Sequence, residues 1–416
     1  MIKKPISKAP PLTKTFILGQ SRKLALISIV SFLLASQVFS GELSGSIGVE
    51  LRLFPHAALL ETQDHTVDAS IILEPEYFHE WDNRRQNIKF APFLRLDQWD
   101  SERSHFDIRE LTWLKAADEW EIRVGIGKVF WGVTESVHLV DIINQTDLIE
   151  NLDTEDKLGQ PMINLAVIQD WGTLDLFVLP GFRERTFPGQ HGRLRTSPRV
   201  ETDQPVYESS LEEAHVDFAV RWSHVIEEFD IGLSHFYGTN REPRLVFGLD
   251  GDEQPVLIPY YDIINQTALD VQATFDDWLW KLEAIHRTGQ GDHFAGLAGG
   301  FEYTFVGILE SAVDMGVVIE YLYDSRGNHA TTPFEDDFTL ALRVTFNDTQ
   351  STELLGGVVF DRDSSAKFFN LEASRRIGDN WKLELEARVF SAIPADDIQY
   401  GIRNDDYVQL SLARYF

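Results

Sequence analysis

The segment that decides the predicted fold is Tyr407-Val-Gln-Leu-Ser-Leu-Ala-Arg-Tyr-Phe416, at the C-terminal end of the 416-residue chain. Its apolar residues Val408, Leu410 and Leu412 alternate with Gln409, Ser411 and Ala413. A period of two residues predicts a half-buried β-strand, because successive side chains of a strand point to opposite faces. The segment then ends on the aromatic Phe416, which is a rare ending for a strand of a soluble protein.

The same alternation recurs from residue 43 onward in segments of about ten residues. Clear examples have the apolar positions Ile47, Val49, Leu51 and Leu53, then Val216, Phe218, Val220 and Trp222, then Phe338, Leu340, Leu342, Val344 and Phe346. Around residues 381–389 the residues between the apolar positions are Lys382, Glu384, Glu386 and Arg388, all charged. A soluble sheet can carry such a face on its wet side, but repetition along the whole chain fits a polar lumen inside a lipid-facing wall better.

The connections between these segments alternate between short and long. Eight short turns lie near 82–86, 117–119, 171–173, 225–228, 276–277, 306–313, 347–352 and 378–380. With both termini on the side of the short turns, eight turns predict about 18 strands, within a range of 14 to 18. The stretches 244–249 and 255–261 fit either a raised loop hairpin or a further membrane pair.

Tryptophans gather near the short turns, at Trp81, Trp120, Trp171, Trp222, Trp278 and Trp381. This placement favours an interfacial belt, although strand-end tryptophan also occurs in soluble β-sandwiches.

The amphipathic final strand with its terminal Phe416 resembles the C-terminal signature of bacterial outer-membrane β-barrels of porin-like type. The resemblance implies an all-β fold, a transmembrane antiparallel up-and-down β-barrel located in the bacterial outer membrane. It also implies contact with outer-membrane lipid and lipopolysaccharide, and recognition of Phe416 by the barrel-insertion machinery. The stretch Gly127-Lys-Val-Phe-Trp-Gly-Val-Thr-Glu-Ser136 is similar to one found in large outer-membrane barrels.

The N-terminal residues 1–40 have the composition of a signal peptide. Six basic residues and no acid precede the apolar run Leu24–Leu34, and Val38 and Ser40 fit a cleavage site after Ser40. We therefore expect a cleaved signal peptide at 1–40 and a single barrel domain at 41–416. The alternative is a leader that stays attached as a membrane anchor. Beyond residue 40, no apolar run approaches the ~20 residues of a membrane helix.

Composition excludes several function classes. The chain has no cysteine, which excludes disulfides, thiol catalysis and cysteine-type zinc sites. Subtracting the six basic residues of 1–40 leaves 31 basic and 66 acidic residues, a net charge of −35. This charge argues against nucleic acid as a partner. We expect no cofactor, no metal site and no enzymatic activity; the acidic turns 250–253 and 361–363 fit solvated loops better than calcium sites.

The first candidate functional segment is 125–161, the longest interruption in the first half of the chain. If it folds into the barrel, Lys128, Glu135, Asp141, Asp147 and Glu150 are placed to line a constriction opposite the wall residues Arg95, Arg109 and Arg123. We add Arg221 and Arg343 on later strands to the pore-lining candidates. Opposed charges across a pore order permeant ions. The alternative is an ordinary surface loop.

The second candidate is a basic patch in a surface loop, formed by Arg183, Arg185, Arg193, Arg195 and Arg199. It fits three roles: binding lipopolysaccharide phosphates, holding an anionic substrate, or pairing with acidic loops nearby.

A third feature is a repeat, because Asp141-Ile-Ile-Asn-Gln-Thr146 recurs as Asp262-Ile-Ile-Asn-Gln-Thr267. The repeat predicts no function by itself.

These features favour a channel for passive diffusion of small polar solutes, with a weak preference for cations because acids are in excess. Two alternatives stay open. One is a substrate-specific outer-membrane transporter, which includes channels for hydrophobic compounds. The other is a non-conducting structural or adhesive barrel. The sequence names no solute and no oligomeric state.

Overall fold

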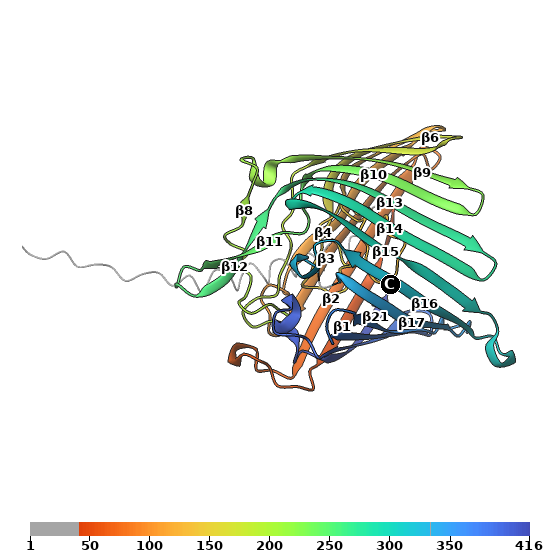
Figure 1. Ribbon diagram of the computed structural model, residues 1–416. Helices are drawn as coiled ribbons and strands as arrows, with labels where there is room; N and C mark the ends of the chain where they lie inside the picture. The colour runs from red at the N-terminus through yellow and green to blue at the C-terminus, as the bar shows by residue number, and fades with distance from the viewer. Residues whose placement is uncertain (1–40, 333) are drawn as a thin grey trace, which may run out of the picture. The chain divides into compact units, whose positions relative to one another are not determined.

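The computed structural model describes residues 41–332 and 334–416. The predicted signal peptide at 1–40 lies outside the described residues. Within Ser44–Phe416, which forms one compact unit, 18 antiparallel strands follow one another around a closed barrel (Figure 1). The predicted fold class and the predicted number of strands are therefore confirmed.

The barrel strands, in the order in which they pair, are β1 (Glu42–Leu53), β2 (Val67–Trp81), β3 (Gln86–Asp97), β4 (Phe106–Ala116), β5 (Trp120–Gly127), β6 (Gln160–Gln169), β7 (Gly172–Pro180), β9 (Val216–Ile226), β10 (Phe229–Thr239), β13 (Ile263–Phe275), β14 (Trp278–Gly289), β15 (Gly291–Phe305), β16 (Asp314–Asp324), β17 (Asp336–Thr345), β18 (Glu353–Asp361), β19 (Lys367–Ile377), β20 (Trp381–Ser391) and β21 (Tyr407–Tyr415). Each strand pairs with its neighbour in the chain, which is up-and-down topology.

The last strand closes the barrel against the first. β1 pairs with β21 in antiparallel register, with Leu51 opposite Leu410 and Val49 opposite Leu412. The backbone of Phe416 adds two hydrogen bonds with Gly45, at 3.0 and 3.2 Å. Closure leaves no unpaired strand edge, which is the condition for a β-structure to cross a bilayer.

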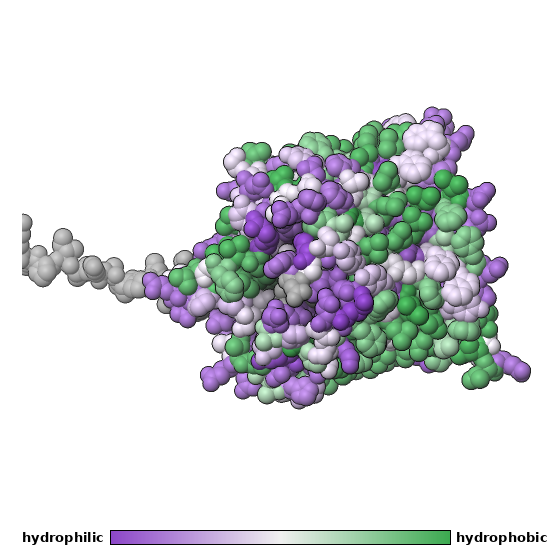
Figure 2. All heavy atoms as spheres, in the orientation of Figure 1, coloured by the Kyte–Doolittle hydropathy of each residue, from purple (hydrophilic) through white to green (hydrophobic). Residues whose placement is uncertain are grey.

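The alternation seen in the sequence separates the two faces of the wall. On β1 the apolar Ile47, Val49 and Leu51 are exposed outward, while Glu50 and Arg52 are buried inward. Figure 2 shows hydrophobic residues over the strands and hydrophilic residues gathered towards both ends of the barrel. The outer face thus has the apolar band that a lipid environment requires.

Short turns gather at one end of the barrel and long connections at the other (Figure 1). The tryptophans Trp81, Trp120, Trp171, Trp278 and Trp381 lie at the short-turn end and are exposed.

At the opposite end, β11 (Arg244–Leu249) and β12 (Pro255–Tyr261) form a hairpin that pairs with β8 (Val206–Tyr207) in a separate three-stranded sheet. The hairpin is therefore a raised loop rather than a membrane pair.

Helical structure in the described part of the chain consists of short 3-10 turns: η2 (Glu61–Gln63), η3 (Glu212–Ala214), η4 (Ile308–Glu310), η5 (Gly327–His329) and η6 (Ile398–Ile402). No helix among the described residues has the length and apolarity needed to span a bilayer.

Candidate functional site

The segment 128–159, between β5 and β6, packs inside the barrel; we call it the inserted segment. Its apolar residues Trp131, Val140, Ile142 and Ile143 are buried in one cluster with inward-facing residues of the wall. These wall residues are Met162, Phe177, Leu179, Ala219, Phe236, Ile264, Ala268, Ile285 and Phe294. Part of the lumen is therefore a packed hydrophobic core, which holds the inserted segment against strands β6–β15.

Small residues on the wall make room for this segment. Gly296 and Ala298 on β15 face inward, and a Cβ atom added to Gly296 would lie 3.6 Å from the Leu139 side chain. Gly232 and Ser234 on β10 also face inward. Because packing density in a protein interior leaves little free volume, a large residue at Gly296 would press on the inserted segment, whereas a side chain at Gly232 would meet Arg221 and Asp270 of the wall.

Two carboxylates of the wall hold the tip of the inserted segment. Glu283 on β14 accepts hydrogen bonds from the backbone N–H groups of Val133, Thr134 and Val140, at 2.7 to 3.1 Å. Glu320 on β16 accepts from the backbone N–H groups of Glu135 and Ser136, at 2.8 and 2.9 Å. Charge-assisted bonds to buried backbone groups are among the stronger hydrogen bonds, so residues 133–140 are fixed to the wall.

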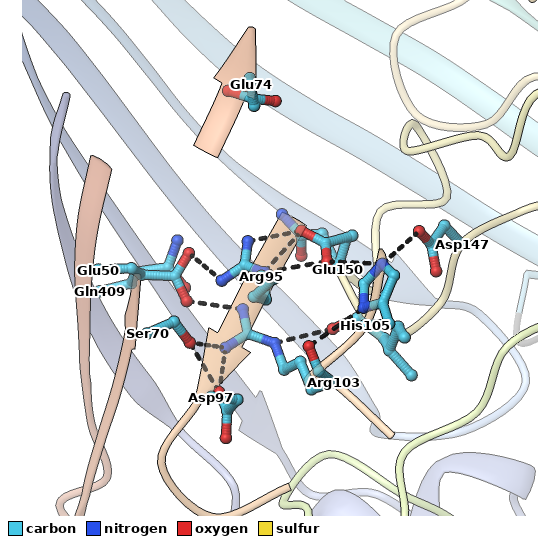
Figure 3. Close-up of polar contacts among 12 residues, drawn as sticks. Glu50, Ser70, Glu74, Arg95, Asp97, Arg103, His105, Asp147, Glu150 and Gln409 are labelled. Atoms are coloured by element: carbon cyan, nitrogen blue, oxygen red, sulfur yellow. Dashed lines mark hydrogen bonds and ion pairs between the residues drawn. The ribbon is translucent and has the colours of Figure 1, made fainter. Parts of the chain in front are cut away.

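A buried ion-pair network, shown in Figure 3, holds the following part of the segment. Arg95 on β3 donates to Glu150 at 2.9 and 2.5 Å, and its other nitrogen lies 3.1 Å from Glu50. Arg103 bridges Glu50 and Asp97 at 2.6 and 2.9 Å. Side chains in these pairs are 6% exposed or less. Each buried charge thus has an opposite charge beside it, which the cost of desolvation requires.

His105, Asp147 and Glu150 in this network lie close enough together to ligate a metal ion. The His105 Nε2 atom lies 3.7 Å from Asp147 and 3.6 Å from Glu150. However, Arg95 already binds Glu150, and Arg109 lies 2.6 Å from Asp147. Because two guanidinium groups occupy the carboxylates, the cluster fits an ion-pair network rather than a metal site.

A cavity of about 1320 Å³ remains between the inserted segment and the wall of β14–β21. Polar and charged groups from both sides line it, and acidic residues outnumber basic residues by eleven to nine. On the segment side lie Glu135, Asp141, Asp153, Asp156 and Lys157; on the wall side lie Arg343, Glu372, Lys382, Glu384, Glu386 and Arg388.

Burial and acidic neighbours change the protonation of the segment. The Asp156 side chain is exposed to the cavity but enclosed by the surrounding barrel, and the resulting loss of solvation, with Glu150 and Asp153 nearby, raises its pKa to about 7. Burial also raises the pKa of Asp153, although Arg388 opposes the shift from 2.9 Å. The charge of the cavity therefore depends on pH near neutrality.

Four of the proposed pore-lining residues lie beside the cavity or within the core. Glu135 lines the cavity and binds Arg343 at 2.7 Å and Lys281 at 3.4 Å. Asp141 also lines the cavity, and it accepts the Trp131 N–H at 2.7 Å. Arg221 binds Asp270 at 2.8 Å, with its guanidinium 5.1 Å from the centre of the Trp131 ring.

The other candidates take different positions. Arg95, Arg109, Asp147 and Glu150 lie in the buried network, away from the cavity lining. Arg123 is half-buried on β5 beside Glu121, at 3.6 Å, and Lys128 is exposed at the start of the inserted segment. The structure thus brings Arg95 and Arg109 against acids of the segment and leaves Arg123 and Lys128 apart from them.

The basic patch lies in the long connection 181–215 between β7 and β9. Arg183 binds Asp107 at 2.8 Å, Arg193 binds Asp405 at 2.7 Å, and Arg199 binds Glu201 at 2.8 Å. Arg185 and Arg195 instead line the cavity. The patch is therefore divided between ion pairs among loops and the cavity wall.

Sequence reasoning missed Glu283 and Glu320, which hold the inserted segment, and Arg103, which joins the buried network. It also left the repeat unexplained. The two copies lie close together, because Ile142 and Ile143 share a cluster with Ile264, and Gln266 donates to the Leu139 carbonyl at 3.4 Å. Asn144 of the first copy donates to the carbonyls of Gly127 and Leu158, which ties the two ends of the segment together.

No protein-family model matches the chain, and no curated protein matches it. Among solved structures, an engineered variant of the porin of Rh. blastica is 10% identical over 90% of this chain and 100% of that chain, with a TM-score of 0.45. A variant of the same porin with two basic and two acidic residues changed to alanine is 12% identical over 90% and 100%, with a TM-score of 0.44. A structure described as "Asymmetric conductivity of engineered proteins" is 10% identical over 91% and 100%, with a TM-score of 0.43. The strand pairing itself establishes a closed, 18-stranded antiparallel barrel.

Proposed function

We propose that this chain is an outer-membrane channel for passive diffusion of small polar solutes, narrowed by the inserted segment. The observation that carries the proposal is a cavity of about 1320 Å³ with charged walls inside a closed barrel whose outer face is apolar. An apolar outside and a wet, charged inside are what a diffusion channel needs. The closed barrel and its apolar outer face support an outer-membrane location.

A substrate-specific channel is the second candidate. The packed cluster around Trp131 and Ile143 fills part of the lumen, so the remaining path is narrow and lined by fixed groups. Fixed groups in a narrow path favour selection among solutes. A non-conducting structural barrel requires that the path be closed at one end.

Liposome swelling tests these candidates with the refolded chain Gly41–Phe416. Neutral sugars of increasing size and small amino acids are supplied outside the liposomes. A diffusion channel gives swelling rates that fall smoothly with solute size. If solutes of one chemical class cause much faster swelling than other solutes of the same size, the result favours the specific transporter. Folded protein without swelling for any solute would contradict both.

A further inference from the structure

Three cations of the cavity wall have no acidic partner among the described residues. They are Lys157 on the inserted segment, and Arg185 and Arg195 on the connection 181–215. Other cations without an ion pair, such as Lys128 and Arg376, are exposed and do not line the cavity. Because the chain has 66 acidic and 37 basic residues, acids are plentiful, so the unpaired charge in the cavity is not due to a shortage of partners.

Lys157 and Arg185 are close enough to influence one another. Burial lowers the pKa of Lys157, and the nearby charge of Arg185 adds to this shift while Asp141 opposes it. The hydrogen-bond partners of both side chains are neutral: Lys157 donates to the Thr146 hydroxyl at 3.2 Å, and Arg185 donates to the Gln145 side chain at 3.4 Å. Neither cation therefore has an acidic hydrogen-bond partner among residues 41–332 and 334–416, although acids lie nearby.

The acid that acts on Arg185, Glu242, is already engaged. Glu242 lines the cavity, where it accepts a bond from Arg287 at 2.9 Å and another from the Thr331 hydroxyl. Burial alone would raise the pKa of Glu242, but Arg287 and Arg185 together hold it below its usual range. Arg185 therefore shares Glu242 with Arg287, while Lys157 has only the charges of Asp141, Asp153 and Asp156 nearby and no ion pair with any of them.

The backbone that carries the pair is held firmly. The Arg185 N–H donates to the Tyr261 hydroxyl at 3.1 Å, and the Tyr261 ring stacks on Tyr207 with centroids 5.4 Å apart. Lys157 lies in a β-bridge with Thr146, and the neighbouring Leu158 N–H donates to the Gln145 carbonyl at 2.8 Å. Groups fixed before a ligand arrives lose less entropy on binding.

Further unused donors and apolar side chains lie on the same cavity wall. Arg195 is 8% exposed, and its Nε atom and the Thr196 hydroxyl are buried without a hydrogen-bond partner. Ile285, Phe294 and Leu322 add apolar surface, and Arg326 lies 3.6 Å from the centre of the Phe294 ring. Cations beside apolar side chains suit an organic anion better than a strongly hydrated inorganic one.

We propose that Lys157 and Arg185 form a binding site for the carboxylate of a small organic anion within the cavity. Arg195 supplies an additional cation for the same anion or for one that follows it. This inference rests on the proposed channel and names a class of solute that the channel selects. Arg and Lys bind carboxylates through charge-assisted hydrogen bonds, and both residues line the cavity without an ion-pair partner in the described part of the chain.

Isothermal titration calorimetry on the folded chain Gly41–Phe416 in detergent tests the site without requiring conduction. The probes are succinate, the uncharged succinamide of similar shape, and inorganic phosphate. We expect saturable binding of succinate and much weaker binding of succinamide. The variants Lys157→Gln and Arg185→Gln should each weaken succinate binding at least about tenfold. Lys128→Gln and Arg376→Gln, which remove exposed unpaired cations, are the matched controls and should leave binding unchanged.

The possible outcomes separate this site from the channel itself. Succinate binding that is absent, or that Lys157→Gln and Arg185→Gln both leave unchanged, overturns the site even if the barrel conducts. Phosphate binding as tight as succinate overturns the assignment to organic anions. A barrel that binds succinate as expected but admits no solute in liposomes supports the site and contradicts the channel. If Arg185→Gln does not fold, as judged by heat-modifiable mobility on gels, Lys157→Gln alone decides.

Discussion

At the scale of single residues, wall carboxylates distinguish this barrel from a plain water-filled tube. Glu283 is fully buried and satisfies three backbone N–H groups of the inserted segment together with the Thr134 hydroxyl. These donors stabilise its charge, and His138 lies 3.9 Å away. A buried acceptor with this many donors cannot be replaced without leaving some donors unsatisfied.

The variant Glu283→Gln should therefore destabilise the folded barrel. The amide keeps one acceptor oxygen but turns an NH₂ group towards backbone donors, which costs about 2–3 kcal/mol. Urea unfolding followed by heat-modifiable mobility on gels measures the loss. Glu384→Gln is the control, because Glu384 also faces the lumen but binds the half-exposed Lys382. Equal stability of the two variants would show that Glu283 does not hold the segment.

Asp156 should make the barrel sensitive to pH between about 4 and 7. Its folded pKa is raised to about 7 from 3.8, so the folded state binds more protons than the unfolded state in this window. Stability should then fall as pH rises from 4 to 7, and the cavity should gain negative charge. In Asp156→Asn both effects should be smaller, as measured by urea unfolding and by reversal potentials at pH 5 and pH 8. A wild-type pH dependence that survives in Asp156→Asn would contradict this assignment.

At the scale of elements, the inserted segment behaves as part of the core rather than as a lid. Hydrophobic packing holds it on β6–β15, two wall carboxylates hold its tip, and ion pairs with Arg95 and Arg109 hold its later part. Three independent attachments make a swinging motion costly, because all of them would have to open together.

A disulfide between the segment and the wall tests this fixed position. The hydroxyls of Ser136 and Thr339 on β17 lie 2.7 Å apart, and the chain has no cysteine of its own. Ser136→Cys combined with Thr339→Cys should therefore form a cross-link cleanly. We expect the same channel conductance before and after reduction, with the single-cysteine variants as controls. A large rise in conductance on reduction would mean that the segment moves away from the wall.

Sequence and structure agree best where the sequence pattern repeats regularly along the chain. The period-two pattern and the tryptophans at the short turns predicted the barrel and its 18 strands, because the lipid boundary imposes both features on every strand. For the candidate segment 125–161 the sequence left two possibilities open, insertion into the barrel and an ordinary surface loop. Its anchors Glu283 and Glu320 are about 150 and 185 residues away in the chain and look like any inward-facing charge. One signal was present: Gly232, Ser234 and Phe236 on β10, and Phe294, Gly296 and Ala298 on β15, are uncharged residues at consecutive inward positions.

At the scale of the whole molecule, the barrel has one apolar outer face and an inside divided between a packed core and a charged cavity. The core lies against β6–β15, and the cavity lies against β14–β21. Acidic residues of the lining exceed basic ones by two, which predicts a weak preference for cations among simple ions. Reversal potentials in a salt gradient measure this preference, and a clear preference for anions would contradict it.

The most direct test of the account is single-channel recording of refolded Gly41–Phe416 in a planar bilayer. We expect stable current steps on the order of a nanosiemens or less, because the proposed channel requires a narrow charged path past the inserted segment. A correctly folded, heat-modifiable barrel that stays electrically silent in the bilayer would contradict the channel.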